Sequence, residues 1–288
     1  DHAQGTSRPW SLDLLPFIID QADWAVLQTG IAQRARLLNA MMADVYGQRE
    51  LLSKGLLPAD LVYGHSGYLP QMQGIEPPNK VWLHMVAFDL GRSPDGKWWV
   101  ITHRMQAPSG LGYALENRLS ISRSFTRGFR EMHIQHLAGF YRDYIDGIRR
   151  LSPKGDSARI ALLTPGPYNE TYFEHTYLAR YLGISLVEGS DLTVRNNSVF
   201  LKTVNGLEPI DGLIRRTDDQ WLDPLELRED SQLGVPGLLQ AIRTGGVVMA
   251  NMPGSGWLES PAIHGFMPGL GQHYLQEDLL LPSVPSWW

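Results

Sequence analysis

The sequence predicts an α/β fold in three parts: an N-terminal helical segment over residues 1–75, a small α+β lobe over residues 76–155, and a domain with a mostly parallel sheet over residues 156–288. Three patterns lead to this prediction. Apolar residues recur at helical spacing in the first part, two strand-like runs flank a turn in the second, and short apolar strands alternate with helical stretches in the third.

A long helical stretch is predicted over residues 12–57, where Asp23 can cap the helix and Gly47 lies near its end. Pro58 starts a further short helix, and the Gly- and Pro-rich residues 64–78 are expected to form a loop. The stripe of the long helix that faces the core consists of residues at three- and four-residue spacing: Ile31, Arg34, Ala35, Leu38, Met41, Met42 and Val45.

In the second part, strands are predicted at residues 80–90 and 98–102, and the turn Ser93–Gly96 between them has the residues that a hairpin requires. Helices are expected at residues 116–125 and 133–151. The polar Gly/Pro stretch that follows, residues 152–155, is the predicted domain boundary.

The third part has the alternation of strands and helices that is typical of a Rossmann-like sheet with helices on both faces. Strands are predicted at residues 159–163, 184–188, 210–215 and 247–250, helices at 169–182 and 237–244, and a hairpin at 194–204 with Asn196 and Asn197 at its turn.

The composition is that of a globular protein with a core: 288 residues, 43% hydrophobic and 19% charged. A net charge of −5 without a dense Lys/Arg stripe argues against a nucleic-acid partner. The apolar run Leu279–Leu281 is far shorter than the ~20 residues of a membrane helix, so no membrane partner is expected. The chain has no cysteine, which excludes thiolate chemistry and fits a cytoplasmic setting.

The first candidate site follows the second predicted hairpin strand. Arg104 and Gln106 stand at the strand end, and Ser109 and Gly110 form a turn after it. Arginine donates two parallel hydrogen bonds to phosphate, and Glu or Asn oxygens suit Mg²⁺. The residues that open the next helix complete the set: Glu116, Asn117 and Arg118. The alternative is that Glu116 only complements the helix dipole while the other two are solvated.

The second candidate site is the loop after the strand at 159–163. Loops at the carboxyl ends of parallel strands bind ligands in open α/β sheets. This loop lacks the phosphate-loop pattern GxxxxGK[ST], but its side chains could hold a peptide-like or amine substrate. These are Tyr168, Asn169, Glu170, Tyr172 and His175. The alternative is an N-cap at Asn169 with aromatic packing below it.

Two further strand ends carry polar residues. Arg215, Arg216 and Asp218 could grip a zwitterionic substrate, or form ion pairs among themselves. Asn251 precedes a glycine loop that could approach a ligand or be a plain turn. The histidines show no metal-ligand spacing, so no metal-binding residue is assigned. We expect the turn after the second hairpin strand and the mouth of the parallel sheet to open onto a common cavity for charged small molecules.

Several long segments resemble the circularly permuted ATP-grasp proteins (type 2), which are distantly similar to glutathionylspermidine synthetase. The segments are 106–110, 113–118, 163–175, 215–219, 222–228 and 233–239. The resemblance implies an ATP-grasp-like lobe over residues 76–155, and ATP and Mg²⁺ as cofactors. It also implies a reaction in which a carboxylate is phosphorylated and an amine attacks the acyl phosphate. The partners implied are a small carboxylate and an amine or peptide.

The sequence departs from the family pattern in two places. Family members that look active carry an acidic/Asn triplet for Mg²⁺ where this chain has Thr102, His103 and Arg104. The half that clamps the nucleotide, with its lysine, would lie beyond Trp288. We therefore expect a fragment of a ligase-like protein that by itself binds ATP weakly or not at all, with a C-terminal half or a fused helical domain as a further partner. The alternative is a non-catalytic binding or scaffold domain with the ATP-grasp shape.

Overall fold

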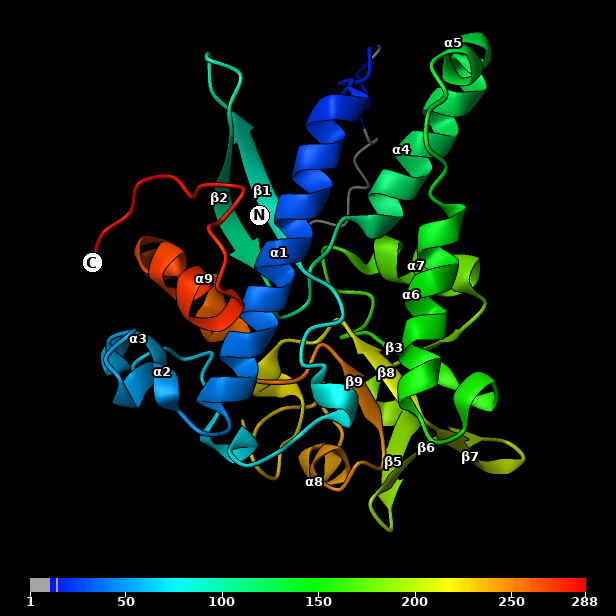
Figure 1. Ribbon diagram of the computed structural model, residues 1–288. Helices are drawn as coiled ribbons and strands as arrows, with labels where there is room; N and C mark the ends of the chain where they lie inside the picture. Colours follow the sequence, from blue (N-terminus) through cyan, green and yellow to red (C-terminus); the bar gives the residue numbers. More distant parts are fainter. Residues whose placement is uncertain (1–10, 14) are drawn as a thin grey trace.

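The computed structural model describes residues 11–13 and 15–288 (Figure 1). The first ten residues of the predicted helical segment, and residue 14 in the predicted long helix, lie outside the described residues. No helix in the described ranges has the length and apolar character needed to cross a membrane.

The predicted long helix is shorter than expected. Helix α1 (Gln21–Val45) begins at Asp20, whose carboxylate accepts from the backbone N–H of Asp23, so Asp20 rather than Asp23 is the cap. The chain leaves the helix after Val45, and Arg49 is left-handed with φ 60°. The Asp44 carboxylate then accepts from the first N–H groups of the next helix, which fixes this break. Two short helices follow: α2 (Glu50–Ser53) and α3 (Ala59–Tyr63).

The predicted hairpin is present as β1 (Ala87–Arg92) and β2 (Trp98–Arg104), which pair antiparallel, with the turn projecting from the body (Figure 1). The first strand starts later than predicted. Residues before it run past α1, where the Asn39 side chain accepts from the N–H groups of Trp82 and Leu83. Those groups are therefore paired with a side chain and not with another strand.

The C-terminal segment fastens the hairpin to α1. Val100 of β2 donates to the Pro282 carbonyl and accepts from Val284. On α1, Gln33 exchanges hydrogen bonds with Asp278 and Leu280, and the buried Arg34 donates to the Leu281 carbonyl over 2.6 Å. Helix α1, the hairpin and the C-terminal segment are thus joined by hydrogen bonds.

The helices of the second part differ from their predicted bounds. Helix α4 (Leu111–Ser124) begins five residues earlier than expected, directly after Gly110 with φ 117°. Helix α5 (Thr126–Glu131) was not predicted, and His133 with φ 51° separates it from α6. Helix α6 (Ala138–Leu151) therefore starts later than expected and ends where the sequence predicts.

A four-stranded sheet in the order β4-β3-β8-β9 is parallel throughout. Its strands are β3 (Ile160–Leu163), β4 (Ser185–Val187), β8 (Gly212–Arg215) and β9 (Val248–Ala250). Helix α7 (Tyr172–Leu182), ended by Gly183, and α8 (Leu238–Arg243) lie near the predicted positions. Helix α9 (Met267–Leu275) was not predicted.

The predicted hairpin at 194–204 is confirmed as part of a second, antiparallel sheet. Its strands are β5 (Leu192–Arg195), β6 (Ser198–Thr203) and β7 (Gly206–Ile210). Asn196 and Asn197 are both left-handed at its turn. The predicted strand at 210–215 is divided at Asp211 into β7 and β8, which belong to different sheets. The Asp211 carboxylate accepts from the N–H of Arg159.

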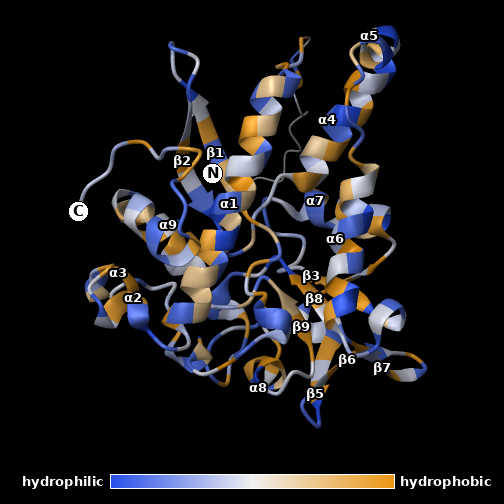
Figure 2. Cartoon of the chain, viewed as in Figure 1, coloured by the Kyte–Doolittle hydropathy of each residue, from blue (hydrophilic) through white to orange (hydrophobic). Residues whose placement is uncertain are grey.

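The parallel sheet is buried on both faces, and Figure 2 shows its strands largely in orange. Alternate side chains point to opposite faces of each strand. On one face, Leu162 and Ile214 pack with residues of α6 and α7. On the other, Leu163 and Leu213 join a cluster that also contains residues of α1 and α8. One apolar cluster therefore connects the N-terminal helical segment with the sheet.

Candidate functional site

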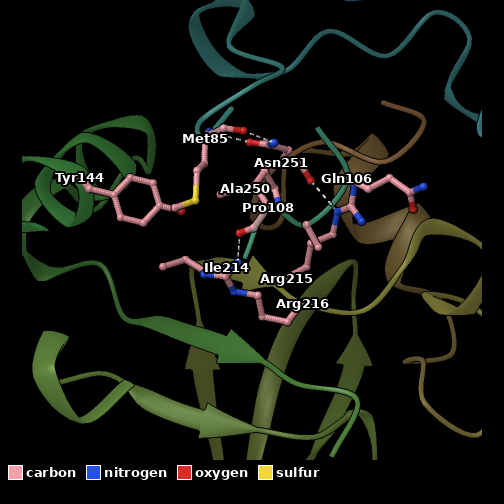
Figure 3. Close-up of a pocket in the computed structure, with 10 residues that line it drawn as sticks. Met85, Gln106, Pro108, Tyr144, Ile214, Arg215, Arg216, Ala250 and Asn251 are labelled. Carbon is pink, nitrogen blue, oxygen red and sulfur yellow. Dashed lines mark hydrogen bonds between the residues drawn. The ribbon is translucent and has the colours of Figure 1, made fainter. Parts of the chain in front are cut away.

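The turn after β2 and the carboxyl ends of β8 and β9 line one pocket (Figure 3). The two regions adjoin, as the sequence predicts. The pocket, however, has a volume of about 10 Å³, which is room for about one water molecule and not for a small-molecule substrate. It is lined by Met85, Gln106, Ala107, Pro108, Tyr144, Ile214, Arg215, Arg216, Ala250 and Asn251.

Arg215 is buried and bound to its own chain. It forms an ion pair with Asp219 over 2.8 Å, and its Nε donates to the Asn251 carbonyl over 2.8 Å. Burial raises the pKa of Asp219, and the charge of Arg215 opposes that rise. The sequence had singled out Asp218, which is exposed. Arg215 therefore fixes the strand end internally with Asp219 as its partner.

Arg216 points to the other side of the same strand end. Its side chain is 6% exposed, and its Nη1 donates to the Pro108 carbonyl (Figure 3). Its Nε has no hydrogen-bond partner. Burial, together with the nearby charge of Arg216, lowers the pKa of His175 to about 4. Within the described residues, Arg216 thus lines the pocket, as Arg215 does, but has no carboxylate partner.

Asn251 joins three segments through its side chain. Its Oδ1 accepts from the N–H groups of His84 and Met85, and its Nδ2 donates to the carbonyls of Met85 and Met105, each over 2.6 Å. All four hydrogen bonds that an amide side chain readily forms are therefore made within the chain. Asn251 holds the end of β9 against the residues that flank the hairpin.

Gln106 forms hydrogen bonds through both its backbone and its side chain, and the sequence does not predict one of the partners, Glu259. Its N–H donates to the Glu259 carboxylate over 2.8 Å, and its Oε1 accepts from the N–H of Asp219 over 3.0 Å. The same carboxylate accepts from Met105 over 2.5 Å. Glu259 lies more than 150 residues away, and no local pattern in the sequence marks it.

The predicted turn residues meet a second carboxylate that was missed, Glu174. It is fully buried and accepts from the N–H groups of Gly110 and Gly112 at the start of α4. A carboxylate at this place satisfies orphan donors and complements the helix dipole. Ser109, between the two anchored ends of the turn, is exposed.

Replacing Glu174 with glutamine is expected to destabilise the protein by about 2 kcal/mol, because the charge at the start of α4 is lost and an amide cannot accept from both N–H groups equally well. The measurement is urea-induced unfolding. Glu170→Gln, an exposed carboxylate in the preceding loop, is the matched control and should change stability by less than about 0.5 kcal/mol. Equal stability of the two variants would contradict the capping role.

The remaining predicted residues of α4 face other helices. Glu116 accepts from the Tyr177 hydroxyl of α7 over 2.8 Å and from Ser120. Arg118 donates to the Gln135 carbonyl, and its guanidinium lies 5.9 Å from the centre of the Phe129 ring. Asn117 is half-buried beside them. The structure does not bring these three residues to the pocket.

The loop before α7 is organised by His175. Asn169 Oδ1 accepts from both the N–H and the hydroxyl of Thr171. Since the Thr171 hydroxyl proton is used there, His175 Nε2 must donate to that hydroxyl, 3.0 Å away. His175 Nδ1 then accepts from the Thr164 hydroxyl over 2.9 Å. The His175 ring is neutral and holds the loop in place. The other predicted residues of the loop do not share this role: Tyr168 and Glu170 are exposed, and Tyr172 is half-buried at the start of α7.

Thr102, His103 and Arg104, where the resemblance leads one to expect an acidic/Asn triplet, point to two faces of β2. Thr102 and Arg104 both donate to the Asp89 carboxylate of β1, over 2.5 and 2.8 Å, on the exposed face. His103 is buried on the other face, where its ring stacks on His264 at 4.3 Å. Arg104 therefore does not line the pocket, and Asp89 is the carboxylate that accompanies it.

The described residues do not suit Mg²⁺ by themselves. Within residues 11–13 and 15–288, no three His, Asp or Glu side chains are grouped so that they could hold a metal ion. Asp89 is already bound by two donors, and Glu174 and Glu259 accept backbone hydrogen bonds. Mg²⁺ prefers several oxygen ligands in octahedral geometry. We therefore assign no metal ligand among the residues that the structure describes.

Comparison with known proteins identifies the class of protein. The sequence pattern of the family described as circularly permuted ATP-grasp type 2 matches residues 16–288. The chain belongs to this family. The mixture of a parallel sheet, an antiparallel hairpin lobe and covering helices is consistent with an ATP-grasp-type fold.

Its relatives are longer proteins without an assigned activity. The chain is 38% identical over 285 residues to the uncharacterized protein sll0335 of Synechocystis, covering 99% of this chain and 59% of that protein. It is 40% identical over 281 residues to the uncharacterized protein Rv2567 of Mycobacterium tuberculosis, covering 97% and 32%. The corresponding values for Rv2411c of the same organism are 37% over 283 residues, 98% and 51%.

Proposed function

We propose that this chain supplies the substrate-binding part of an ATP-dependent carboxylate–amine ligase that acts through an acyl phosphate. The observation that carries the proposal is membership of the ATP-grasp family over residues 16–288. The parallel sheet would serve as a Rossmann-like substrate domain. Ligands of open α/β sheets bind beyond the carboxyl ends of the strands, and the pocket with Arg216 lies at that edge.

Trapping with hydroxylamine tests this proposal without knowledge of the natural amine. The γ-phosphoryl group of ATP passes to a carboxylate oxygen and ADP leaves; hydroxylamine then attacks the acyl carbon and releases phosphate, leaving a hydroxamate. The 288-residue chain and the Synechocystis relative are assayed side by side with pools of amino acids and dicarboxylic acids. We expect the relative to form hydroxamate and ADP in equal amounts. ADP release that does not depend on any carboxylate, or no hydroxamate from either protein, would contradict a ligase.

A non-catalytic binding or scaffold domain is the second candidate. It is favoured by the polar residues of the site, since Asn251, Arg215, Gln106 and Glu174 are all bound to groups of their own chain. A scaffold would form no hydroxamate in the assay above while keeping its ligand affinity. Turnover in that assay would exclude it.

A further inference from the structure

Arg216 stands apart from the other buried groups of the site because its charge has no acidic partner within the part of the chain that the structure describes. Only 6% of the side chain is exposed. Its contacts are the Pro108 carbonyl through Nη1, while Nε has no partner. Taking a cation out of water without a counter-charge is costly, so an anionic oxygen that reached Arg216 would offset part of that cost.

Arg215 provides the comparison within the same strand end. It is equally buried, yet it has the Asp219 carboxylate at 2.8 Å and hydrogen bonds to the carbonyls of Asn251 and Thr217. The fold therefore supplies a full set of partners to one arginine and leaves its neighbour with a single carbonyl. Arg216 lines the pocket together with Tyr144, and its Nε has no hydrogen-bond partner.

The segment that covers Arg216 is held at its two ends and not in its middle. Glu259 binds the N–H groups of Met105 and Gln106, and Glu174 binds that of Gly110. Between these anchors lie residues 107–109, to which Arg216 is joined by its hydrogen bond to the Pro108 carbonyl. A carbonyl oxygen is a weak acceptor for a guanidinium compared with an anionic oxygen.

We propose that Arg216 binds an anionic oxygen of a ligand, a carboxylate or a phosphate, and that this oxygen replaces the Pro108 carbonyl when residues 107–109 move out of the pocket. The present volume of about 10 Å³ admits a water molecule, so the displacement of this segment is a necessary part of binding. The inference rests on the proposed function, because the anionic oxygen assigned to this site belongs to the acidic group of the proposed substrate.

Anion binding is measured from the thermal unfolding midpoint as the concentration of inorganic phosphate or acetate is increased. NaCl at equal ionic strength is the reference, and neither ATP nor a second substrate is needed. We expect one of the two ions to raise the midpoint saturably, by about 5 °C, in the wild type. Arg216→Gln should abolish this rise. Arg195→Gln, which removes the same charge from an exposed strand end, should retain it. The ion that acts identifies the chemistry as carboxylate or phosphate.

The free protein provides a second readout. Arg216→Gln removes an unpaired buried charge, so its midpoint without added anion should equal or exceed that of the wild type. If this variant does not fold, Arg216→Lys replaces it and should weaken the binding about 10-fold, because lysine lacks the planar fork. The proposal is overturned if neither ion acts beyond the NaCl reference, or if the Arg216 variants respond like the wild type. A failure to form hydroxamate with the anion response intact would reject the ligase and leave the anion site standing.

Discussion

Replacing Asn251 with alanine is expected to lower the free energy of unfolding by about 4 kcal/mol. The substitution leaves the N–H groups of His84 and Met85 and the carbonyl of Met85 without their side-chain partner, and the Met105 carbonyl keeps the Ser255 hydroxyl at 3.2 Å. Each unsatisfied buried polar group costs about 1–3 kcal/mol, and a water molecule entering the space can recover part of that cost.

Urea-induced unfolding measures this effect, with Asn205→Ala in the exposed turn between β6 and β7 as the matched control, expected to stay within about 0.5 kcal/mol of the wild type. Asn251→Asp is the sharper variant, since it keeps the acceptor but presents an oxygen to two carbonyls. It should be at least as destabilising as alanine. A loss below about 1 kcal/mol in both Asn251 variants would show that this side chain does not join the three segments.

The second large effect is expected from acid. Burial lowers the pKa of His84, His175 and His264 to about 4 and that of His103 to about 3. For His103 and His264 the charge of Arg34 adds to the effect of burial. In the unfolded chain these groups titrate near pH 6.5. As the pH falls below that value, the unfolded chain takes up protons that the folded protein does not, so stability is present above pH 6.5 and is lost towards pH 4.

His175 alone should account for a loss of about 2 kcal/mol between pH 7 and pH 5, and the other three histidines act in the same direction. Urea-induced unfolding across that range measures the slope. His175→Gln should reduce the slope, because the titrating group is gone, whereas His136→Gln, at an exposed position, should leave it unchanged. Stability that stays constant from pH 7 to pH 5 would mean that these histidines are not held neutral.

The elements that the sequence predicts well are those whose signals are local. The turn residues Asn196 and Asn197, and the glycine that ends α7, specify backbone conformations that few other residues adopt, and the structure has them in place. The buried strands were found from their short apolar runs. The start of α4 was misplaced because its cap, Glu174, lies 64 residues further along the chain.

The candidate site shows the same division between local and distant information. The shared edge of the parallel strands follows from a general rule of such sheets. The turn after β2 adjoins that edge although β2 belongs to a separate sheet. Its chemistry depends on pairings that no spacing reveals. Asp89 lies opposite Thr102 in the hairpin register and also pairs with Arg104, Glu259 accepts from the N–H of Gln106 although it lies 153 residues away, and Arg215 rather than Arg216 has a carboxylate partner.

The fastening of α1 to the C-terminal segment has a mechanical consequence. Because Gln33 and Arg34 hold residues 278–281, a force that pulls α1 away from this segment acts first on those hydrogen bonds. The load then passes through Val100 into the β1–β2 hairpin, which is paired with the same segment. Stretching this protein would therefore break the hydrogen bonds between α1 and residues 278–281 first, and the hairpin would be released with them. The parallel sheet would bear no load until those bonds had broken.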